Sequence, residues 1–373
     1  MIVHVLTALS YKAHCTTYPF KVFEKQLLEN DIEIRYFYRP SAKITECDAL
    51  VILNEAFVTK GLLLFNEDRN SFLERVRSAV TTILWLDTGD GSGNTWFGVL
   101  PYVDLYCKAS LLRDKNRYAS PLYSERFSSD YYHRQFGIVD ERRSDNRSPL
   151  NSDDIEKVTV SWNLGLGDLH ASTKWRRRRR MLYGEPSYDY RTCKVSVYRQ
   201  IDVSYRVANH RHLATVSFPR KRVKDLLENS RLSADWKIIA GGKIKYEDYI
   251  AEMWGTAVAP SPFGLGEVCY RDFEAYLAGA LLFKPDMAHI ETWPDYFKPG
   301  DTYVPFAWDF SDFIDQLEHF LISRAEREEI AQRGQDYYLR SLSKKGGEEF
   351  AAHFNRLIKM AQRKSLGSSK VYN

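Results

Sequence analysis

The feature that most constrains this chain is an alternation of apolar, strand-like segments with amphipathic, helical segments, which occurs twice along the sequence. In the first series the expected strands lie at residues 2–9, 33–38, 48–54 and 81–86, and the expected helices at 18–30 and 71–80. In the second series the expected strands lie at 212–218, 236–242, 256–262 and 280–285, and the expected helices at 220–230, 245–254 and 267–279. Strands that alternate with helices predict a parallel α/β sheet, so we expect two such sheets.

A charged stretch rich in serine and asparagine, residues 139–154, separates the two series. Such composition is typical of a surface excursion or linker. We therefore expect an N-terminal Rossmann-like domain over 1–150, a linker near the domain junction over 151–200, a C-terminal Rossmann-like domain over 201–340, and a C-terminal helix and tail over 341–373. A chain of 373 residues is long enough for two domains with separate cores.

Composition excludes several classes of protein. The 53 Lys and Arg residues against 49 Asp and Glu give a net charge of only +4, so overall charge does not demand a nucleic-acid partner. The five cysteines show no CxxC spacing, which fits free thiols in a reducing compartment. The sequence lacks both a signal-peptide pattern at its start and an apolar run of the roughly 18 residues that a membrane-spanning helix needs. We expect a cytoplasmic protein whose contact with the inner membrane, if it has any, is peripheral.

The most informative segment is APSPFGLGEVCYRDFEAYLAG, in which a strand is followed by a glycine turn and then by a helix. Gly264 and Gly266 lie in the turn, and the helix is expected to open around Glu267. Glycines before a helix let backbone N–H groups approach a ligand, and the positive end of the helix favours phosphate. Arg271 and Glu274 follow at helical spacing, so an arginine can meet a diphosphate while a carboxylate accepts ribose hydroxyls. A capped surface helix with a Glu267–Arg271 pair is the alternative.

This segment resembles glycosyltransferases of the GT-B architecture, in particular the group-1-like bacterial enzymes with the pattern S-P-x-G-x-G-E-x-x-x-R-x-F-E-A-x-x-x-G. The matching residues are Ser261, Pro262, Gly264, Gly266, Glu267, Arg271, Phe273, Glu274, Ala275 and Gly279. The resemblance implies two Rossmann-like domains that face each other across a cleft, with helices at the C-terminus. It also implies a nucleotide sugar as donor substrate, bound mainly by the C-terminal domain, and an acceptor bound mainly by the N-terminal domain. No cofactor and no metal ion are expected.

The resemblance also suggests residue roles on the donor side. Glu274 is similar to the family's ribose-binding glutamate, and Arg271 and the turn from Gly264 to Gly266 resemble its contacts to the donor phosphate and sugar. Many retaining members carry two glutamates eight positions apart. Here Glu267 and Glu274 are seven apart, and Gly266 occupies the position of the first. The role of Glu267 and the stereochemical outcome therefore stay open.

A basic cluster, Pro219-Arg220-Lys221-Arg222, follows the strand expected at 212–218. We expect Arg220 to bind the donor by offsetting the negative charge of a leaving diphosphate. A solvated helix start is the alternative interpretation.

The loop DTGDGSG follows a buried strand in the N-terminal half, and its carboxylates are the catalytic candidates. Asp87 or Asp90 is expected to act as general base toward an acceptor hydroxyl, or to orient it. Asp and Gly also favour turns for conformational reasons alone. His14 and His170 are weaker candidates for the base.

Five consecutive arginines follow Trp175 near the expected domain junction: Arg176, Arg177, Arg178, Arg179 and Arg180. They could contact a polyanion such as nucleic acid, an anionic glycan or an acidic membrane surface, although charge runs more often form a solvated face.

The resemblance implies a glycosyltransferase that moves a sugar from a nucleotide-sugar donor to a hydroxyl acceptor, and by analogy with the family we expect it to act in the synthesis of a bacterial surface or capsular polysaccharide. Two alternatives stay open. One is a glycosyltransferase that acts on modified DNA bases, for which the arginine run is the only support. The other is a non-catalytic nucleotide-sugar-binding protein.

Overall fold

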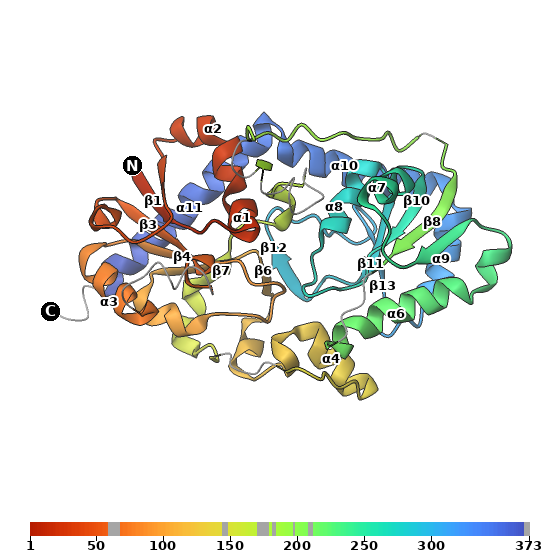
Figure 1. Ribbon diagram of the computed structural model, residues 1–373, viewed down its shortest axis with the longest axis horizontal. Coiled ribbons are helices and arrows are strands. Elements are labelled where there is room, and N and C mark those ends of the chain that lie inside the picture. Colours follow the sequence, from red (N-terminus) through yellow and green to blue (C-terminus); the bar gives the residue numbers. More distant parts are fainter. Residues whose placement is uncertain are drawn as a thin grey trace.

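Two parallel β-sheets lie side by side along the long axis of the molecule, each covered by helices (Figure 1). The computed structural model describes residues 1–58, 68–143, 148–169, 179–180, 184–196, 198–207 and 212–368. The fold class expected from the sequence, two Rossmann-like domains with C-terminal helices, is confirmed by this arrangement.

The first sheet has six strands in the order β2-β1-β3-β4-β5-β7, and all neighbouring strands are parallel. Its central strands are apolar and fully buried, as expected for a sheet covered on both faces. The strands are β1 (Ile2–Leu6), β2 (Glu33–Phe37), β3 (Ala49–Leu53), β4 (Ile83–Asp87), β5 (Leu105–Lys108) and β7 (Val158–Val160), and the helices between them include α1 (Tyr11–Val22), α2 (Glu24–Leu28) and α3 (Arg69–Ala79).

The second sheet has five parallel strands in the order β13-β11-β10-β8-β9. The strands are β8 (Ile201–Arg206), β9 (Ile238–Gly241), β10 (Thr256–Pro260), β11 (Leu281–Pro285) and β13 (Val304–Phe306), and the helices are α6 (Ala214–Glu228), α7 (Tyr246–Trp254), α8 (Tyr270–Ala278), α9 (Phe313–Ile322) and α10 (Arg324–Leu342).

Pairs of secondary-structure elements pack together across the two halves. Strand β6 (Ser110–Leu112), from the N-terminal half, pairs antiparallel with β12 (Ile290–Thr292) from the C-terminal half. Helix α4 (Phe127–Phe136) packs against α6, with the rings of Phe136 and Phe218 4.9 Å apart. The last helix, α11 (Lys344–Ser368), runs back from the second sheet to cover the first (Figure 1), where Phe350 and Phe354 join the core of β1, β3 and β4.

Residues 212–218, expected as a strand, are helical instead, and this expectation was wrong. They lead into and begin α6, and the strand of this region is β8, at Ile201–Arg206. The physical reason lies in the spacing of the apolar side chains. Thr215, Pro219, Val223 and Leu227 are buried at helical intervals of four, whereas the residues midway between them, 217, 221 and 225, are not buried, although in a strand they would share the same face.

The start of one helix also differs from expectation. Helix α8 begins at Tyr270 rather than around Glu267, because Cys269 caps it in a reciprocal pair with Asp272.

Two segments from beyond residue 150 belong to the N-terminal half of the structure. The first sheet includes β7, which lies beyond residue 150 and pairs with β5. Helix α11, within the segment 341–373, also packs on the first sheet rather than on the second.

Candidate active site

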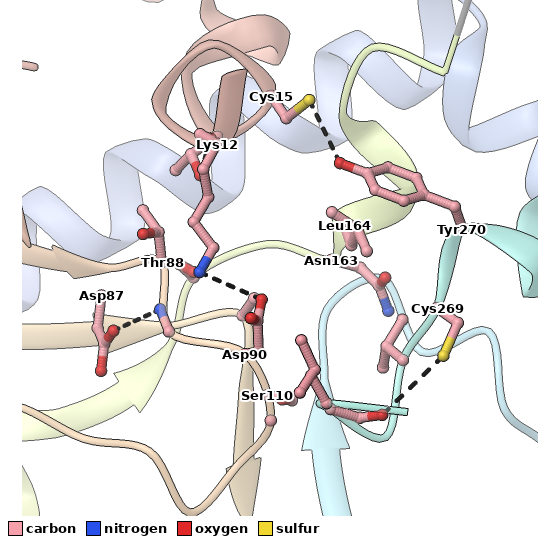
Figure 2. Close-up of a pocket in the computed structure, with 18 of the residues that line it drawn as sticks. Lys12, Cys15, Asp87, Thr88, Asp90, Ser110, Asn163, Leu164, Cys269 and Tyr270 are labelled. Carbon is pink, nitrogen blue, oxygen red and sulfur yellow. Dashed lines mark hydrogen bonds and ion pairs between the residues drawn. The ribbon is translucent and has the colours of Figure 1, made fainter. Parts of the chain in front are cut away.

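A cavity of about 400 Å³ lies between the two domains, where the loops after β4 and β10 approach each other. Such a position, outside the carboxyl ends of parallel strands, is where open α/β folds bind ligands. Figure 2 shows side chains from α1, from the loop after β4 and from the segment before α8 around it. Its lining residues include Tyr11, Lys12, Cys15, Asp87, Thr88, Asp90, Asn163, Arg220, Gly266, Cys269 and Tyr270.

A second cavity, of about 370 Å³, lies within the C-terminal domain. Three of the residues predicted to bind the donor, Arg220, Arg271 and Glu274, line it together. Arg220 and Cys269 line both cavities, so the two spaces meet at these side chains. The other lining residues are Arg206, Val207, Lys243, Ile244, Tyr246, Tyr249 and Pro262.

Arg271, in the first turn of α8, lines the second cavity. Its Nη2 atom donates to the backbone oxygen of Arg206, and its guanidinium lies 5.4 Å from the ring centre of Tyr205. Its Nε atom is buried and has no hydrogen-bond partner among the described residues. A buried donor without an acceptor costs about 1–3 kcal/mol, so a bound anion at this position would be favoured.

Glu274, one turn further along α8, is held by Tyr249. The Tyr249 hydroxyl donates to Glu274 Oε2 at 2.8 Å. Burial, followed by the charge of Glu274, raises the pKa of Tyr249 well above its usual range, so this hydroxyl keeps its proton.

Arg220 lies across the glycine turn. Its Nε atom donates to the Phe263 oxygen at 3.3 Å. A Cβ atom on Gly264 would lie 2.5 Å from Arg220 Nη2, so a glycine is what lets the guanidinium occupy this place. Burial lowers the pKa of Arg220, but an arginine remains charged at neutral pH.

The two aspartates of the N-terminal loop differ in their surroundings. Asp87, at the end of β4, accepts hydrogen bonds from the Tyr106 hydroxyl and from Gly89 N (2.6 Å). It also forms an ion pair with Lys108 at 3.3 Å, and both of these side chains are fully buried. Lys108 also donates to the Gly89 oxygen. The contacts of Asp87 therefore shape the loop, and its oxygens are already engaged.

Asp90 is 47% exposed and forms an ion pair with Lys12, 3.2 Å away. Figure 2 shows these two side chains pointing toward each other at the wall of the interdomain cavity. Both predicted catalytic aspartates line this cavity, and Asp90 is the more exposed of the two because Asp87 is buried.

Glu267 lines neither cavity. It is buried at the domain interface, where Ser92 donates to it twice, from the backbone N (2.9 Å) and from Oγ (2.8 Å). Burial alone would raise the pKa of Glu267, but His289 and the donors of Ser92 outweigh it and lower this pKa to about 2. Glu267 is therefore an ionised carboxylate that joins the domains.

The remaining predicted residues lie away from the two cavities or outside the described ranges. His14 is buried against Asp168, 3.1 Å away, and His170 lies outside the described residues. Arg180 is engaged within the protein, because it pairs with Asp168 at 3.1 Å and donates to the Tyr18 hydroxyl. Arg179 is exposed, and Arg176, Arg177 and Arg178 lie outside the described residues.

Several residues of the site were not predicted from the sequence. Lys12 lies in the first turn of α1, just after β1, and could have been found because the carboxyl ends of all parallel strands meet at one edge of the sheet. Ser92, Tyr249 and Tyr270 carry no pattern that marks them, since their roles depend on contacts between segments far apart in the chain.

Within the described ranges, no group of three or more His, Cys, Asp or Glu side chains is placed to hold a metal ion. The predicted absence of a metal requirement stays a prediction. Nor does any helix in the part of the chain searched have the length and apolar character to cross a membrane.

Residues 219–344 match the protein family described as Glycosyl transferase-like. No curated protein matches the sequence. Among solved structures, T4 phage beta-glucosyltransferase shares 11% identity over 96% of this chain and 99% of its own, with a TM-score of 0.44. An alpha-glucosyltransferase in complex with UDP and DNA containing an HMU base shares 9% identity over 97% and 99% of the two chains, with a TM-score of 0.49.

A third solved structure, Anabaena HepE in complex with UDP-glucose, shares 10% identity over 95% of this chain and 99% of its own, with a TM-score of 0.41. The matched family segment begins at Pro219 and contains the donor candidates Arg220, Arg271 and Glu274. The matched segment lies in the C-terminal half of the chain, and the two parallel sheets with a cavity between them have the arrangement of the GT-B fold.

Proposed function

We propose that this protein transfers a sugar from a nucleotide-sugar donor to a hydroxyl acceptor in the cavity between its two domains. The observation that carries the proposal is the position of Arg220, which lines both the interdomain cavity and the cavity that contains Arg271 and Glu274. A nucleotide sugar fits two cavities that meet at an arginine, because its nucleoside and its sugar lie at opposite ends and the diphosphate lies between them.

In this proposal the nucleoside occupies the cavity within the C-terminal domain. The carboxylate of Glu274, fixed by Tyr249, accepts hydrogen bonds from ribose hydroxyls. The unpartnered Nε of Arg271 and the guanidinium of Arg220 bind the diphosphate. The sugar then extends past Arg220 into the interdomain cavity.

The chemistry requires charge to be offset on the leaving group and a proton to leave the acceptor. As the bond between sugar and phosphate breaks, negative charge grows on the diphosphate, and Arg220 and Arg271 stabilise it. Asp90 is proposed as the group that orients the acceptor hydroxyl and takes its proton. Lys12 pairs with Asp90 at the cavity wall, and Asp87 holds the loop in place.

The proposed acceptor is a hydroxyl of a bacterial surface or capsular glycan, and metal independence is part of the proposal. Duplex DNA with hydroxymethylated bases is the alternative acceptor, because solved structures with a similar fold include a glucosyltransferase bound to DNA. One of the five arginines that could serve a polyanion, Arg180, is already paired with Asp168.

The test is a transfer assay with a panel of labelled nucleotide sugars that includes UDP-glucose. Each donor is offered a glycan mixture, duplex DNA with hydroxymethylated bases, or no acceptor, with and without EDTA. Transfer to glycan that survives EDTA and is lost in Arg220→Ala is the expected result. Transfer to DNA alone would overturn the proposed acceptor, and donor binding without transfer or hydrolysis would leave a non-catalytic binding protein.

A further inference from the structure

Glu267 and Ser92 form a buried contact between the two domains, beside both cavities. Glu267 precedes α8, and Ser92 follows β4 in the loop that carries Asp90. Both side chains are almost fully buried, at 2% and 0% exposure. The carboxylate accepts from Ser92 N at 2.9 Å and from Ser92 Oγ at 2.8 Å, so one acidic group fixes both the backbone and the side chain of this loop.

The backbones of the same two loops touch. A Cβ atom on Gly266 would lie only 2.5 Å from Gly91 N, and Gly91 has a φ of +76°, which favours glycine. The loop of Ser92 is held from its other side as well, because the Tyr118 hydroxyl donates to the Ser92 oxygen at 2.9 Å. The loops that contain Gly91 and Gly266 therefore pack closely, and the hydrogen bonds between Glu267 and Ser92 hold them together.

Among the described residues, the two Ser92 donors bond to Glu267 alone, and His289 lies nearby. Its Nε2 atom is 3.9 Å from Glu267 Oε1, beyond hydrogen-bond distance, and its ring packs against Phe127 (5.2 Å) and Trp308 (4.7 Å). A buried carboxylate is costly unless it is paired and hydrogen-bonded. The donors of Ser92 meet that need in the geometry that the structure shows.

The contact links the donor side of the site to the acceptor side. Ser92 lies two residues after Asp90, and Glu267 lies four residues before Arg271. We propose that Glu267 is a positioning residue that holds the Asp90 loop against the donor cavity through Ser92, without touching the donor itself. This inference rests on the proposed function, because it assigns Glu267 a part in placing the acceptor's base.

The chain offers a matched control at a second buried contact. Thr215, at the start of α6, donates from its backbone N (2.7 Å) and from its hydroxyl to the carboxylate of Asp140. Both side chains are buried, and neither lines the two cavities. Thr215→Ala therefore removes the same kind of bond as Ser92→Ala, but away from Asp90.

The first experiment compares Ser92→Ala and Glu267→Gln with Thr215→Ala. In the first two variants we expect kcat to fall about tenfold or more, since small displacements of catalytic groups are that costly. The Kd for a nucleoside diphosphate should stay within about twofold of wild type, because donor contacts are retained. Thr215→Ala should keep kcat within the same margin. An unchanged kcat in Ser92→Ala, or an equal loss in Thr215→Ala, would overturn the inference.

Hydrogen exchange separates failure of this inference from failure of the proposed function. Without any ligand, amides of residues 88–93 should exchange faster in Glu267→Gln than in wild type, and at the wild-type rate in Thr215→Ala. If exchange is faster in Glu267→Gln but the protein binds no nucleotide, the proposed function is overturned, and Glu267 has only a structural role. Unchanged exchange and unchanged kcat in a protein that transfers sugar would overturn the role of Glu267 alone.

Discussion

Arg271 and Arg220 both line one cavity, and Arg271 carries a buried N–H donor, at Nε, that the described residues leave unsatisfied. Hydrogen bonds to charged groups contribute about 1.5–3 kcal/mol each. An anion that pairs with Arg271 Nε therefore gains binding energy without competition from a neighbouring side chain.

Replacing Arg271 by alanine should weaken the binding of a nucleoside diphosphate by about 10- to 100-fold, as measured by titration calorimetry, because one charge-assisted contact is lost. Arg231→Ala is the control, since Arg231 is exposed and pairs with Glu318 on the surface. Loss of folding by circular dichroism, with unchanged affinity in the folded fraction, would show that Arg271 serves structure alone.

Variants of the two loop aspartates should differ in whether they affect catalysis or stability. Asp90→Asn removes an exposed carboxylate and should lower kcat by about 100-fold or more, with little change in the free energy of unfolding. Asp87→Asn leaves the buried Lys108 ammonium without its ionised partner and should lower the free energy of unfolding by about 3 kcal/mol. Urea unfolding and steady-state kinetics measure the two effects. If both variants lose the same factor in kcat and have the same free energy of unfolding, this division of roles is contradicted.

At the residue scale, the sequence predicted that Arg271 and Glu274 lie close together, but it did not predict the difference between Asp87 and Asp90. Arg271 and Glu274 are separated by one helical turn, so their shared face follows from local geometry. The roles of Asp87 and Asp90 could not be separated in the same way, because the difference between them comes from Lys108, Tyr106 and Lys12 on other segments.

At the scale of elements, the glycine turn before α8 makes two different close approaches. Gly264 faces the end of a flexible side chain, Arg220, whereas Gly266 faces the backbone of Gly91. A methyl group at the first position displaces a guanidinium, and one at the second pushes two loops apart.

Gly264→Ala should therefore weaken binding of a nucleoside diphosphate, by about tenfold, with a smaller change in kcat. Gly266→Ala should lower kcat by about tenfold and leave the Kd nearly unchanged, since it separates the Asp90 loop from the donor domain. Kinetics and calorimetry on the two variants measure these effects. The same profile in both would show that the turn acts as one unit.

Element prediction from the sequence succeeded for most segments and failed where an apolar run fitted both a strand and a helix. The strands β3, β4, β10 and β11 and the helices α7 and α8 were all expected close to their places. Residues 212–218 were expected as a strand because a short apolar run fits either structure. Only the continuation of its burial pattern to Leu227 identifies it as a helix.

At the scale of the whole molecule, helix α11 of the C-terminal segment packs into the core of the first sheet. Phe354 of α11 is fully buried, with its ring 4.7 Å from that of Phe20 in α1. The sequence indicated an amphipathic helix here but not its partner, because periodicity identifies the apolar face of a helix and not what that face covers.

Phe354→Ala should destabilise the N-terminal domain by about 3–5 kcal/mol, since it removes a large buried side chain. Thermal unfolding followed by tryptophan fluorescence measures the effect. Lys359→Ala, at an exposed position of the same helix, is the control and should change stability little. A loss as large in the control would contradict the packing of α11 on the first sheet.

The central claim is that one nucleotide sugar spans both cavities and passes Arg220 between them. A crystal structure with a bound nucleoside diphosphate tests it most directly. The account predicts ribose hydroxyls on Glu274, the diphosphate on Arg271 and Arg220, and the terminal phosphate directed into the interdomain cavity toward Asp90. A nucleotide bound elsewhere, or bound in reverse with its base beside Asp90, would contradict the account.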